Sequence, residues 1–259
     1  MLLAIDIGNT NVSIGLFHGR QLESTWRIST DNPKTADEYG ILLTQIITMH
    51  GNTLSDISMA SICSVVPPLT STFETLCQKY LDINPLVIGS GTKTGIKVLY
   101  DSPRDVGSDR IVDAAAANHL YGGPCIVVDL GTATVFDAIN DNSEYLGGAI
   151  SPGLTIAADS LYNSTSQLKR VELIAPSVAI GRNTTHSIQS GLILGYSDLI
   201  SGMILRFKKE LGENSKVIAT GGLAKILKSE VNLFDVIDVD LTLKGLQIIF
   251  DMNHTGLNK

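Results

Sequence analysis

The strongest constraint on the fold is a sequence pattern that occurs twice, once in each half of the chain. The segment LAIDIGNTNVSIGLF begins at Leu3, and VVDLGTATVFDAI begins at Val127. Each contains an apolar run that ends in an aspartate, then one apolar residue, a glycine, a short polar stretch and a second apolar run. Apolar runs bounded by turn residues are typical of strands. Two copies of such a strand-turn-strand unit predict a duplicated architecture.

Each copy opens a triplet of predicted strands, after which helices and single strands alternate. The strand triplets span residues 2–7, 12–17 and 22–28, and residues 125–130, 133–140 and 145–150. The other predicted strands are 57–65, 85–88, 217–220 and 236–239. The predicted helices are 35–50, 68–80, 110–120, 154–162, 185–211, a helix after Gly222, and 242–253. This order predicts an α/β fold of two duplicated halves, 1–118 and 119–259, with mixed sheets flanked by helices and a ligand cleft between them.

The composition and net charge of the chain limit which kinds of protein and partner are consistent with the sequence. Of the 259 residues, 44% are hydrophobic and 17% are charged, which predicts a globular chain that buries a large core. The net charge of −7 argues against nucleic acid and anionic membranes as partners. The three cysteines form no paired motif, and no signal peptide is recognisable, so we expect a cytoplasmic protein. The apolar segment from Ser190 to Leu205 contains Asp198 and three glycines, and it predicts a buried helix rather than a membrane span.

The chemistry of the two echoed turns favours a phosphate ligand. Gly8 permits close backbone approach, and the following Asn9, Thr10 and Asn11 add side-chain donors beside their N–H groups. Asp6 would repel a phosphate, but it could accept a hydrated Mg²⁺ that accompanies a nucleotide. In the second turn Asp129, Gly131, Thr132 and Thr134 are predicted to repeat this arrangement. Two such turns suit a triphosphate, although each could also be a plain strand connection with its aspartate capping local N–H groups.

The spacing of acidic residues in the sequence does not by itself identify a general base for phosphoryl transfer to an alcohol. Asp109 lies at the start of a predicted helix, where the helix dipole favours an ionised carboxylate, and Arg110 beside it could bind an acidic substrate. Alternatively, Ser108 or Asp109 is only an N-cap and Arg110 a solvated residue. Spacing alone favours this second interpretation.

The ordered motifs DIGNTN, GSDRIVDAAAA, DLGTAT, GGAISPG, SVAIGRNTTHSIQSG and ATGG resemble the type III pantothenate kinases. This family belongs to the superfamily of acetate kinase, sugar kinases, Hsp70 and actin, so the resemblance implies two actin-like, ribonuclease H-like halves. It also implies ATP-dependent phosphorylation of pantothenate, the first step of coenzyme A biosynthesis, by a cytoplasmic homodimer. Ser108 departs from the family pattern, which usually has alanine there, and we expect no loss of activity from this change.

The resemblance also implies roles for individual residues. Asp109 would be the proton acceptor, which reverses the preference from spacing. The implied ATP-binding residues are Asp6, Ile7, Gly8, Asn9, Thr10, Asn11, Val12, Ser13 and Thr132. The implied pantothenate-binding residues are Tyr100, Gly107, Ser108, Asp109, Arg110 and Thr184. Asp129 would hold a monovalent cation, K⁺ or NH₄⁺, while Asp6 would face the Mg²⁺ that accompanies ATP.

Two other functions remain open on the sequence. One is a nucleotide-binding regulator that keeps the fold without catalysis, which the loss of Asp6, Asp109 or Asp129 would favour; all three are present. The other is a superfamily kinase for a different small alcohol or acid. The chain lacks the large insertions that usually form sugar or acetate sites, and this favours pantothenate.

Overall fold

The computed structural model of the chain describes residues 1–254. They fold into two compact units that interleave in sequence. Unit 1 contains residues 1–96, 101–116 and the segment from 241 onward, and unit 2 contains residues 97–100 and 117–240. The predicted boundary after residue 118 therefore falls within helix α3 (Ser108–Tyr121), and the last helix, α8 (Leu241–His254), groups with unit 1 instead of the C-terminal half.

Unit 1 is built on a five-stranded mixed sheet with the order β3-β2-β1-β4-β5. Its strands are β1 (Leu2–Ile7), β2 (Asn11–His18), β3 (Gln21–Ser29), β4 (Met59–Ser64) and β5 (Leu86–Val87). β1 is antiparallel to β2 and parallel to β4. β1 is buried along nearly its whole length, as expected for an apolar central strand.

Unit 2 repeats this topology in a six-stranded sheet with the order β11-β10-β7-β8-β9-β6. Its strands are β6 (Lys97–Val98), β7 (Cys125–Leu130), β8 (Ala133–Ile139), β9 (Glu144–Pro152), β10 (Lys216–Thr220) and β11 (Val236–Ile237). Read from β9 to β11, the strand order and directions match those of unit 1 from β3 to β5. The predicted duplication of an α/β unit with a mixed sheet is confirmed.

The short strand β6 was not predicted. It lies between residues 89 and 109, where no helix or strand is predicted. Lys97 and Val98 pair with Glu144 and Tyr145 of β9, and Lys97 Nζ lies 2.8 Å from Glu144 Oε1. β6 therefore depends on pairing with a strand distant in sequence, which local composition does not reveal.

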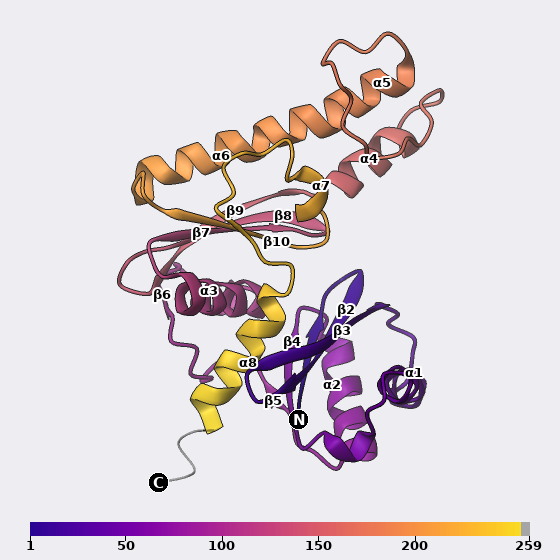
Figure 1. Cartoon of the computed structure of the whole chain (residues 1–259), viewed down its shortest axis with the longest axis vertical. Coiled ribbons are helices and arrows are strands. Elements are labelled where there is room, and N and C mark those ends of the chain that lie inside the picture. Colours follow the sequence, from indigo (N-terminus) through magenta and orange to yellow (C-terminus); the bar gives the residue numbers. More distant parts are fainter. Residues whose placement is uncertain (255–259) are drawn as a thin grey trace. The chain divides into compact units, whose positions relative to one another are not determined.

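Helices cover both faces of the unit 1 sheet (Figure 1). They are α1 (Ala36–Met49), α2 (Pro67–Leu76) with the π-helical turn η2 (Cys77–Leu81), α8, the first part of α3, and the 3₁₀ turns η1 (Leu54–Asp56) and η3 (Pro103–Asp105). α1 and α2 pack on one face of the sheet, while α8 and the first part of α3 pack on the other. Thr35 is the N-cap of α1 and forms a reciprocal capping box with Glu38.

The helices of unit 2 are α4 (Leu154–Asn163), α5 (Thr184–Gln189), the π-helical turn η4 (Ser190–Leu194), α6 (Gly195–Leu211) and α7 (Ala224–Leu227). Figure 1 shows α5 and α6 as one long rod, with α6 lying along the sheet. Buried side chains of α6, among them Ile200 and Ile204, pack into the unit 2 core.

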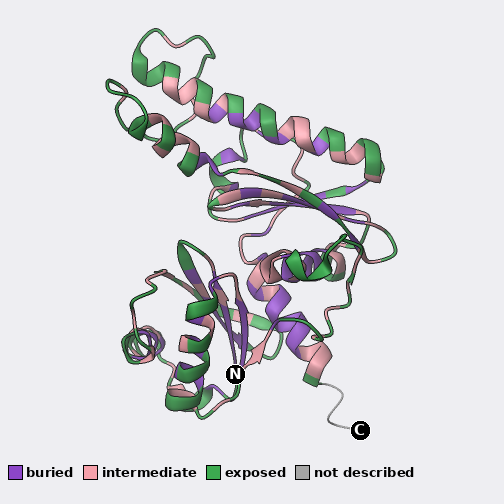
Figure 2. Cartoon of the chain, turned by 180° about the vertical axis from the view of Figure 1, so that it is seen from behind, coloured by how far each residue is buried: buried purple, intermediate pink, exposed green. Residues whose placement is uncertain are grey.

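The long helix is not buried as the sequence predicts. In Figure 2 most of its surface is exposed or intermediate, with buried residues confined to one side. By length and composition alone, the stretch Thr184–Leu211 could cross a membrane, and it is the one such helix among residues 1–254. Its one-sided burial against the sheet is the pattern of an amphipathic helix that packs on a globular unit.

Candidate active site

The residues predicted for the site divide between the two units. Unit 1 holds the turn after β1 and the start of α3, with Asp6 to Ser13 and Gly107 to Arg110. Unit 2 holds Tyr100, Asp129, Thr132 and Thr184.

The first predicted phosphate turn joins β1 to β2. Asp6 pairs with Ser13 and Ile7 with Val12, so residues 8–11 form the connection. The Gly8 N–H donates to the Asn11 carbonyl at 3.0 Å, and a Cβ on Gly8 would lie 3.1 Å from that same oxygen. Glycine therefore fits a turn that leaves little room for a side chain.

Thr30, which follows β3, donates two hydrogen bonds to carbonyl groups of this turn. Its hydroxyl donates to the Gly8 carbonyl at 2.6 Å, and its N–H donates to the Thr10 carbonyl at 3.0 Å. Sequence reasoning did not single out Thr30. Its contact becomes recognisable only once β2 and β3 are paired, because Asn11 then lies opposite Ser29.

The residues of the first turn differ in what they can offer a ligand. Asn9, Thr10 and Asn11 are exposed at the tip, as a donor-rich turn requires. Ile7 and Val12 are fully buried in the unit 1 core, so they could contact a nucleotide only through their backbone. The predicted ATP-binding set therefore combines side-chain and main-chain donors.

Asp109 is the second residue of α3 and is partly buried. Its Oδ1 accepts a hydrogen bond from the Arg110 N–H at 2.8 Å. A Cβ on Gly107 would collide with that same Oδ1, so glycine makes room for the carboxylate. Asp109 thus satisfies one of the free N–H groups in the first turn of the helix, but as the second helical residue it is not the N-cap.

Burial raises the pKa of Asp109 above its ordinary value, while the Arg110 N–H and the positive charge of Arg110 oppose the rise. Desolvation therefore outweighs the stabilisation that a helix N-terminus gives to a carboxylate. A carboxylate with a raised pKa accepts a proton more readily, which is what a general base requires.

Ser108 ties the start of α3 to the end of β4. Its hydroxyl donates to the Ser64 carbonyl at 3.0 Å and accepts a hydrogen bond from Cys63 Sγ at 3.2 Å. Ser108 is therefore not the cap of its own helix, and the N-cap interpretation fails for this residue.

Cys63 is a neighbour of the site that sequence reasoning missed. It is fully buried and lies opposite Asp6 in the parallel pairing of β1 with β4. Burial raises the pKa of the Cys63 thiol well above its usual range, and the negative charges of Asp6 and Asp109 add to the rise. The phosphate turn and the start of α3 therefore lie within electrostatic reach of one thiol inside unit 1.

The second predicted phosphate turn joins β7 to β8. Leu130 pairs with Thr134, and the Gly131 N–H donates to the Ala133 carbonyl at 3.1 Å. Thr132 is exposed at the tip, and its carbonyl accepts the Gly153 N–H at 3.1 Å. A Cβ on Gly153 would lie 2.7 Å from the Gly131 carbonyl, so the start of α4 packs closely against the turn.

The prediction that Thr134 contributes a donor like those of the first turn is wrong. Thr134 is fully buried, and its hydroxyl lies 2.5 Å from the hydroxyl of Tyr196 on α6. The connection between paired residues is one position shorter here than in the first turn, so Thr134 is already part of the sheet. The sequence similarity between the two turns therefore extends to Thr134, although the local structures already differ there.

Asp129 is the second-last residue of β7, and its carboxylate lies close to Gly131 and Gly221. A Cβ on Gly221 would lie 2.5 Å from Asp129 Oδ1, and one on Gly131 would lie 3.5 Å from Oδ2. Gly221 also has φ +87°, a conformation that favours glycine. The ATGG segment that contains Gly221 therefore packs against the aspartate, which explains why a glycine follows β10.

Tyr100 packs against β9 within unit 2. Its ring centroid lies 6.3 Å from that of Tyr145, and a Cβ on Gly147 would lie 3.4 Å from Tyr100 Cε2. The side chain is 37% exposed, so one part of the ring remains accessible to a ligand.

Thr184 is the first residue of α5 and is exposed. The preceding Asn183 caps this helix, because its side chain accepts the His186 N–H at 2.9 Å. A Cβ on Gly181 would lie 2.7 Å from the His186 carbonyl carbon. In the GRNTT motif, Gly181 and Asn183 therefore shape the backbone that presents Thr184.

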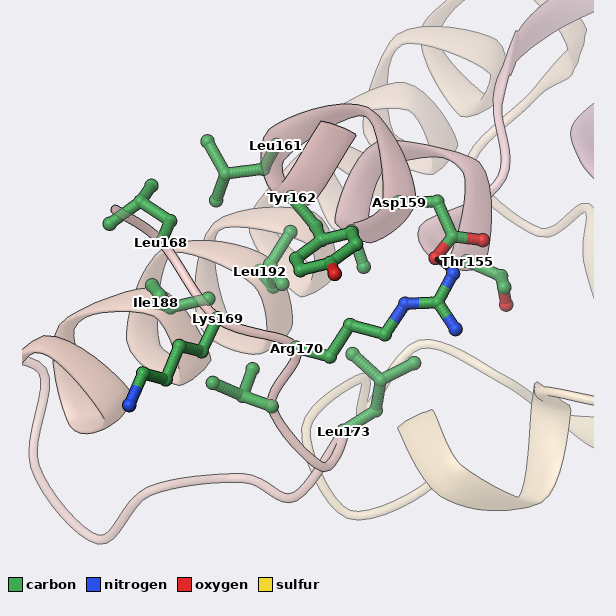
Figure 3. A pocket seen from close by; sticks show the side chains of 12 residues that line it. Thr155, Asp159, Leu161, Tyr162, Leu168, Lys169, Arg170, Leu173, Ile188 and Leu192 are labelled. Carbon is green, nitrogen blue, oxygen red and sulfur yellow. Dashed lines mark ion pairs between the residues drawn. The ribbon is translucent and has the colours of Figure 1, made fainter. Parts of the chain in front are cut away.

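Two pockets of unit 2 lie beside α4 and α5. Figure 3 shows the first, where Arg170 extends past the Tyr162 ring toward Asp159. Arg170 Nη2 lies 3.3 Å from Asp159 Oδ1, and the guanidinium carbon lies 5.0 Å from the Tyr162 ring centroid. No predicted site residue lines this pocket, whereas Thr184 lines the second together with Leu161, Leu168 and Leu192.

Metal-binding candidates are limited to single carboxylates. Within residues 1–254 no group of three or more His, Cys, Asp or Glu side chains has the arrangement of a metal site. Any cation at Asp6 or Asp129 would need further oxygen ligands from the backbone, the nucleotide or water, as is common for hard cations.

A family model described as type III pantothenate kinase matches residues 2–206. The matched region contains both phosphate turns, the start of α3 and the GRNTT motif. It leaves out the ATGG segment and the last helix.

Solved structures similar to this chain show the same fold. A Campylobacter jejuni protein named as a Baf family transcriptional activator has 20% identity and a TM-score of 0.63, with 98% of this chain and 99% of that chain covered. An inorganic polyphosphate/ATP-glucomannokinase from Arthrobacter sp. strain KM has 16% identity and a TM-score of 0.51, with the same coverage. The ethanolamine utilization protein EutJ from Carboxydothermus hydrogenoformans has 11% identity and a TM-score of 0.55, with coverages of 95% and 89%.

These matches confirm the predicted fold class, which sugar kinases and actin-like proteins share. The family match spans most of the chain and includes both duplicated turns. The chain therefore belongs to the type III pantothenate kinase family.

Proposed function

We propose that this protein transfers the γ-phosphoryl group of ATP to the primary hydroxyl of pantothenate, forming 4′-phosphopantothenate in the first step of coenzyme A biosynthesis. Family membership supports a kinase. The observation that carries the finer proposal is the position of Asp109, partly buried at the first turn of α3, with a raised pKa and Arg110 beside it.

Asp109 accepts the proton of the pantothenate hydroxyl as the bond to phosphorus forms. Phosphoryl transfer depends mostly on positioning and charge stabilisation, and a carboxylate near the hydroxyl also orients it. Arg110 offers a guanidinium to the carboxylate of pantothenate. Tyr100 and Thr184 are the proposed contacts to the rest of the substrate.

The two turns bind the phosphates of ATP. Backbone N–H groups and the exposed side chains of Asn9, Thr10 and Asn11 act in unit 1, and the Thr132 turn acts in unit 2. Such donors bind anions in a protein whose net charge is −7. Asp6 faces the Mg²⁺ of Mg·ATP, directly or through water, and this ion neutralises charge on the phosphates when bound.

Asp129 is the proposed ligand of a monovalent cation, K⁺ or NH₄⁺. Its carboxylate lies against Gly221 and Gly131, where an added Cβ would crowd its oxygens. The two glycines let the backbone come close to this carboxylate, and oxygen donors suit K⁺. A carboxylate oxygen is a suitable donor for such a hard cation, and this supports the proposal.

A homodimer is proposed for the active form. Unit 2 carries several exposed apolar side chains on α4 and α6, including Ile156, Tyr162, Leu199 and Leu205. A partner subunit that covered these side chains would bury their apolar surface, and this supports the proposal. Sedimentation equilibrium of the full chain tests this, with a mass of about twice the 27.7 kDa monomer expected.

A nucleotide-binding regulator is the second candidate. The observation that favours it is the structural match to the C. jejuni protein that is named as a transcriptional activator. Such a regulator would bind nucleotide without consuming pantothenate. The acidic net charge argues against direct DNA contact.

Substitution of Asp109 by asparagine tests the catalytic proposal. We expect Asp109→Asn to lower kcat for pantothenate-dependent ADP formation by about a hundredfold or more, with binding of Mg·ATP retained. Asp105→Asn is the matched control, because Asp105 is a nearby exposed aspartate in η3. Wild-type turnover of Asp109→Asn would contradict the role of Asp109 as the base.

A further inference from the structure

Tyr196 forms a buried polar link between α6 and the second phosphate turn. Only 8% of Tyr196 is exposed, and its hydroxyl donates to the Pro152 carbonyl at 2.7 Å. The Thr134 hydroxyl lies 2.5 Å from the same Tyr196 oxygen. A phenol has one proton to donate, so Thr134 donates to Tyr196 while Tyr196 donates to Pro152.

The two residues that Tyr196 contacts lie on neighbouring strands beside the turn, Thr134 on β8 and Pro152 at the end of β9. Thr134 is the first residue of β8 that pairs with β7 beyond the turn. Pro152 directly precedes Gly153, whose N–H donates a hydrogen bond to the Thr132 carbonyl at 3.1 Å. The Tyr196 hydroxyl therefore connects the strand that leaves the turn with the segment that packs on its tip.

We propose that Tyr196 is a positioning residue, which holds the Thr132 turn in the conformation that binds the phosphate groups of a nucleotide. This inference rests on the proposed function, because that function assigns Thr132 to ATP. Tyr196 acts through Thr134 and Pro152 and needs no contact with the nucleotide itself. A turn that is already in its binding conformation loses less entropy when the ligand binds.

The environment of Tyr196 suits this role over a wide pH range. Burial raises the pKa of the phenol, and the hydrogen bond from Thr134 opposes the rise. The phenol therefore stays protonated in neutral buffer and keeps its donor toward Pro152. We accordingly expect no pH-dependent loss of the link near neutrality.

Tyr196→Phe removes the hydroxyl and keeps the ring that packs in the unit 2 core. We expect KM for ATP to rise about tenfold, while kcat and KM for pantothenate stay within about twofold of wild type. The matched control is Tyr121→Phe, which removes a hydroxyl that donates to Asp238 Oδ2 at 2.6 Å elsewhere in unit 2. Tyr121→Phe should leave KM for ATP unchanged.

A second readout does not depend on the substrate. Mg·ATP should raise the Tm of the wild-type protein, and Tyr196→Phe should show a smaller rise at the same ATP concentration. If pantothenate is not a substrate but this difference in Tm shift is found, the proposed function fails while the role of Tyr196 stands. Equal ATP-induced Tm shifts in wild type and Tyr196→Phe would overturn the role of Tyr196. Similar fold-changes in kcat, KM for ATP and KM for pantothenate would also overturn it.

Thr134 supplies an independent variant if Tyr196→Phe does not fold. Thr134→Val removes the donor to Tyr196 and should also raise KM for ATP, whereas Thr134→Ser keeps the hydroxyl and should restore it. The double variant Thr134→Val/Tyr196→Phe should raise KM by less than the product of the two single effects, because both remove one shared link. Fully multiplicative effects would contradict a shared link.

Discussion

The two turns proposed to bind phosphate have similar sequences, but different contacts hold them in place. The first turn has exposed donors at its tip, and the hydroxyl of Thr30, which follows β3, donates to the Gly8 carbonyl of the turn. The second turn is packed against Gly153 and braced from α6 through Tyr196. A duplicated motif thus conserves the strand-turn-strand backbone within one chain, while the support of each copy depends on its own surroundings.

The largest expected effects separate the two aspartates. Asp6→Asn should lower kcat/KM for Mg·ATP by about 10- to 100-fold, because it weakens a proposed Mg²⁺ contact. Asp129→Asn should instead reduce the stimulation of activity by K⁺. Initial rates measured at varied Mg·ATP and at varied K⁺ distinguish the two variants. If both variants respond alike to Mg·ATP and to K⁺, the separate roles proposed for Asp6 and Asp129 are wrong.

A comparison of two glycines tests how tightly each turn is packed. Gly153→Ala places a methyl group 2.7 Å from the Gly131 carbonyl, and overpacking of this kind costs about 1–3 kcal/mol. Gly8→Ala places one 3.1 Å from the Asn11 carbonyl and should destabilise less. Urea unfolding of both variants checks this order. A larger loss of stability in Gly8→Ala would contradict the account of the second turn.

Removal of the Thr30 hydroxyl tests the tether of the first turn. Thr30→Val loses the hydrogen bond to the Gly8 carbonyl, which is worth about 1 kcal/mol. We expect an increase in KM for ATP of a few-fold, smaller than that for Tyr196→Phe. Thr30→Ser keeps the hydroxyl and serves as the control. An equal increase in Thr30→Ser would mean that the methyl group, not the hydrogen bond, matters.

The smallest expected effect concerns stability and pH. Because burial raises the pKa of Asp109 in the folded state, the folded protein binds more protons than the unfolded chain above the ordinary value of 3.8. Asp109 therefore reduces stability as pH rises from about 3.8 through its raised folded pKa. At pH 7 the Tm of Asp109→Asn should equal or exceed that of wild type by a few degrees at most. Thermal melts between pH 4 and 8 check this, and a clear fall in Tm at pH 7 would contradict it.

Much of the fold could be predicted from local patterns. β1 and β7 begin and end at the predicted residues, because each apolar run stops at a polar turn. The helix predicted for residues 35–50 is observed as α1, Ala36–Met49, with Thr35 as its N-cap. The repeated sequence pattern predicted a duplicated unit, and the matching strand orders of the two sheets confirm the duplication.

The parts that escaped prediction depend on contacts between distant residues. β6 exists through its pairing with β9, and the burial of Thr134 depends on Tyr196 of α6. The one-sided exposure of α6 also reflects tertiary packing, because an apolar composition does not say which face of a helix meets the sheet.

The candidate site shows the same division. The motifs located Asp6, Asp109 and Asp129, since turn glycines and helix starts are visible in sequence. They did not reveal Cys63, which joins the site only because β4 pairs with β1 and α3 begins beside it. Nor did they show that the side chains of Ile7 and Val12 point into the core.

The most direct test of the proposed kinase is identification of its product. The full chain would be incubated with ATP, Mg²⁺ and pantothenate in potassium buffer and in sodium buffer, and the products identified by mass spectrometry and ³¹P NMR. We predict 4′-phosphopantothenate and an equal amount of ADP, formed mainly in potassium. No phosphorylated product in either buffer, from folded protein that still binds ATP, would contradict the account and favour the nucleotide-binding regulator.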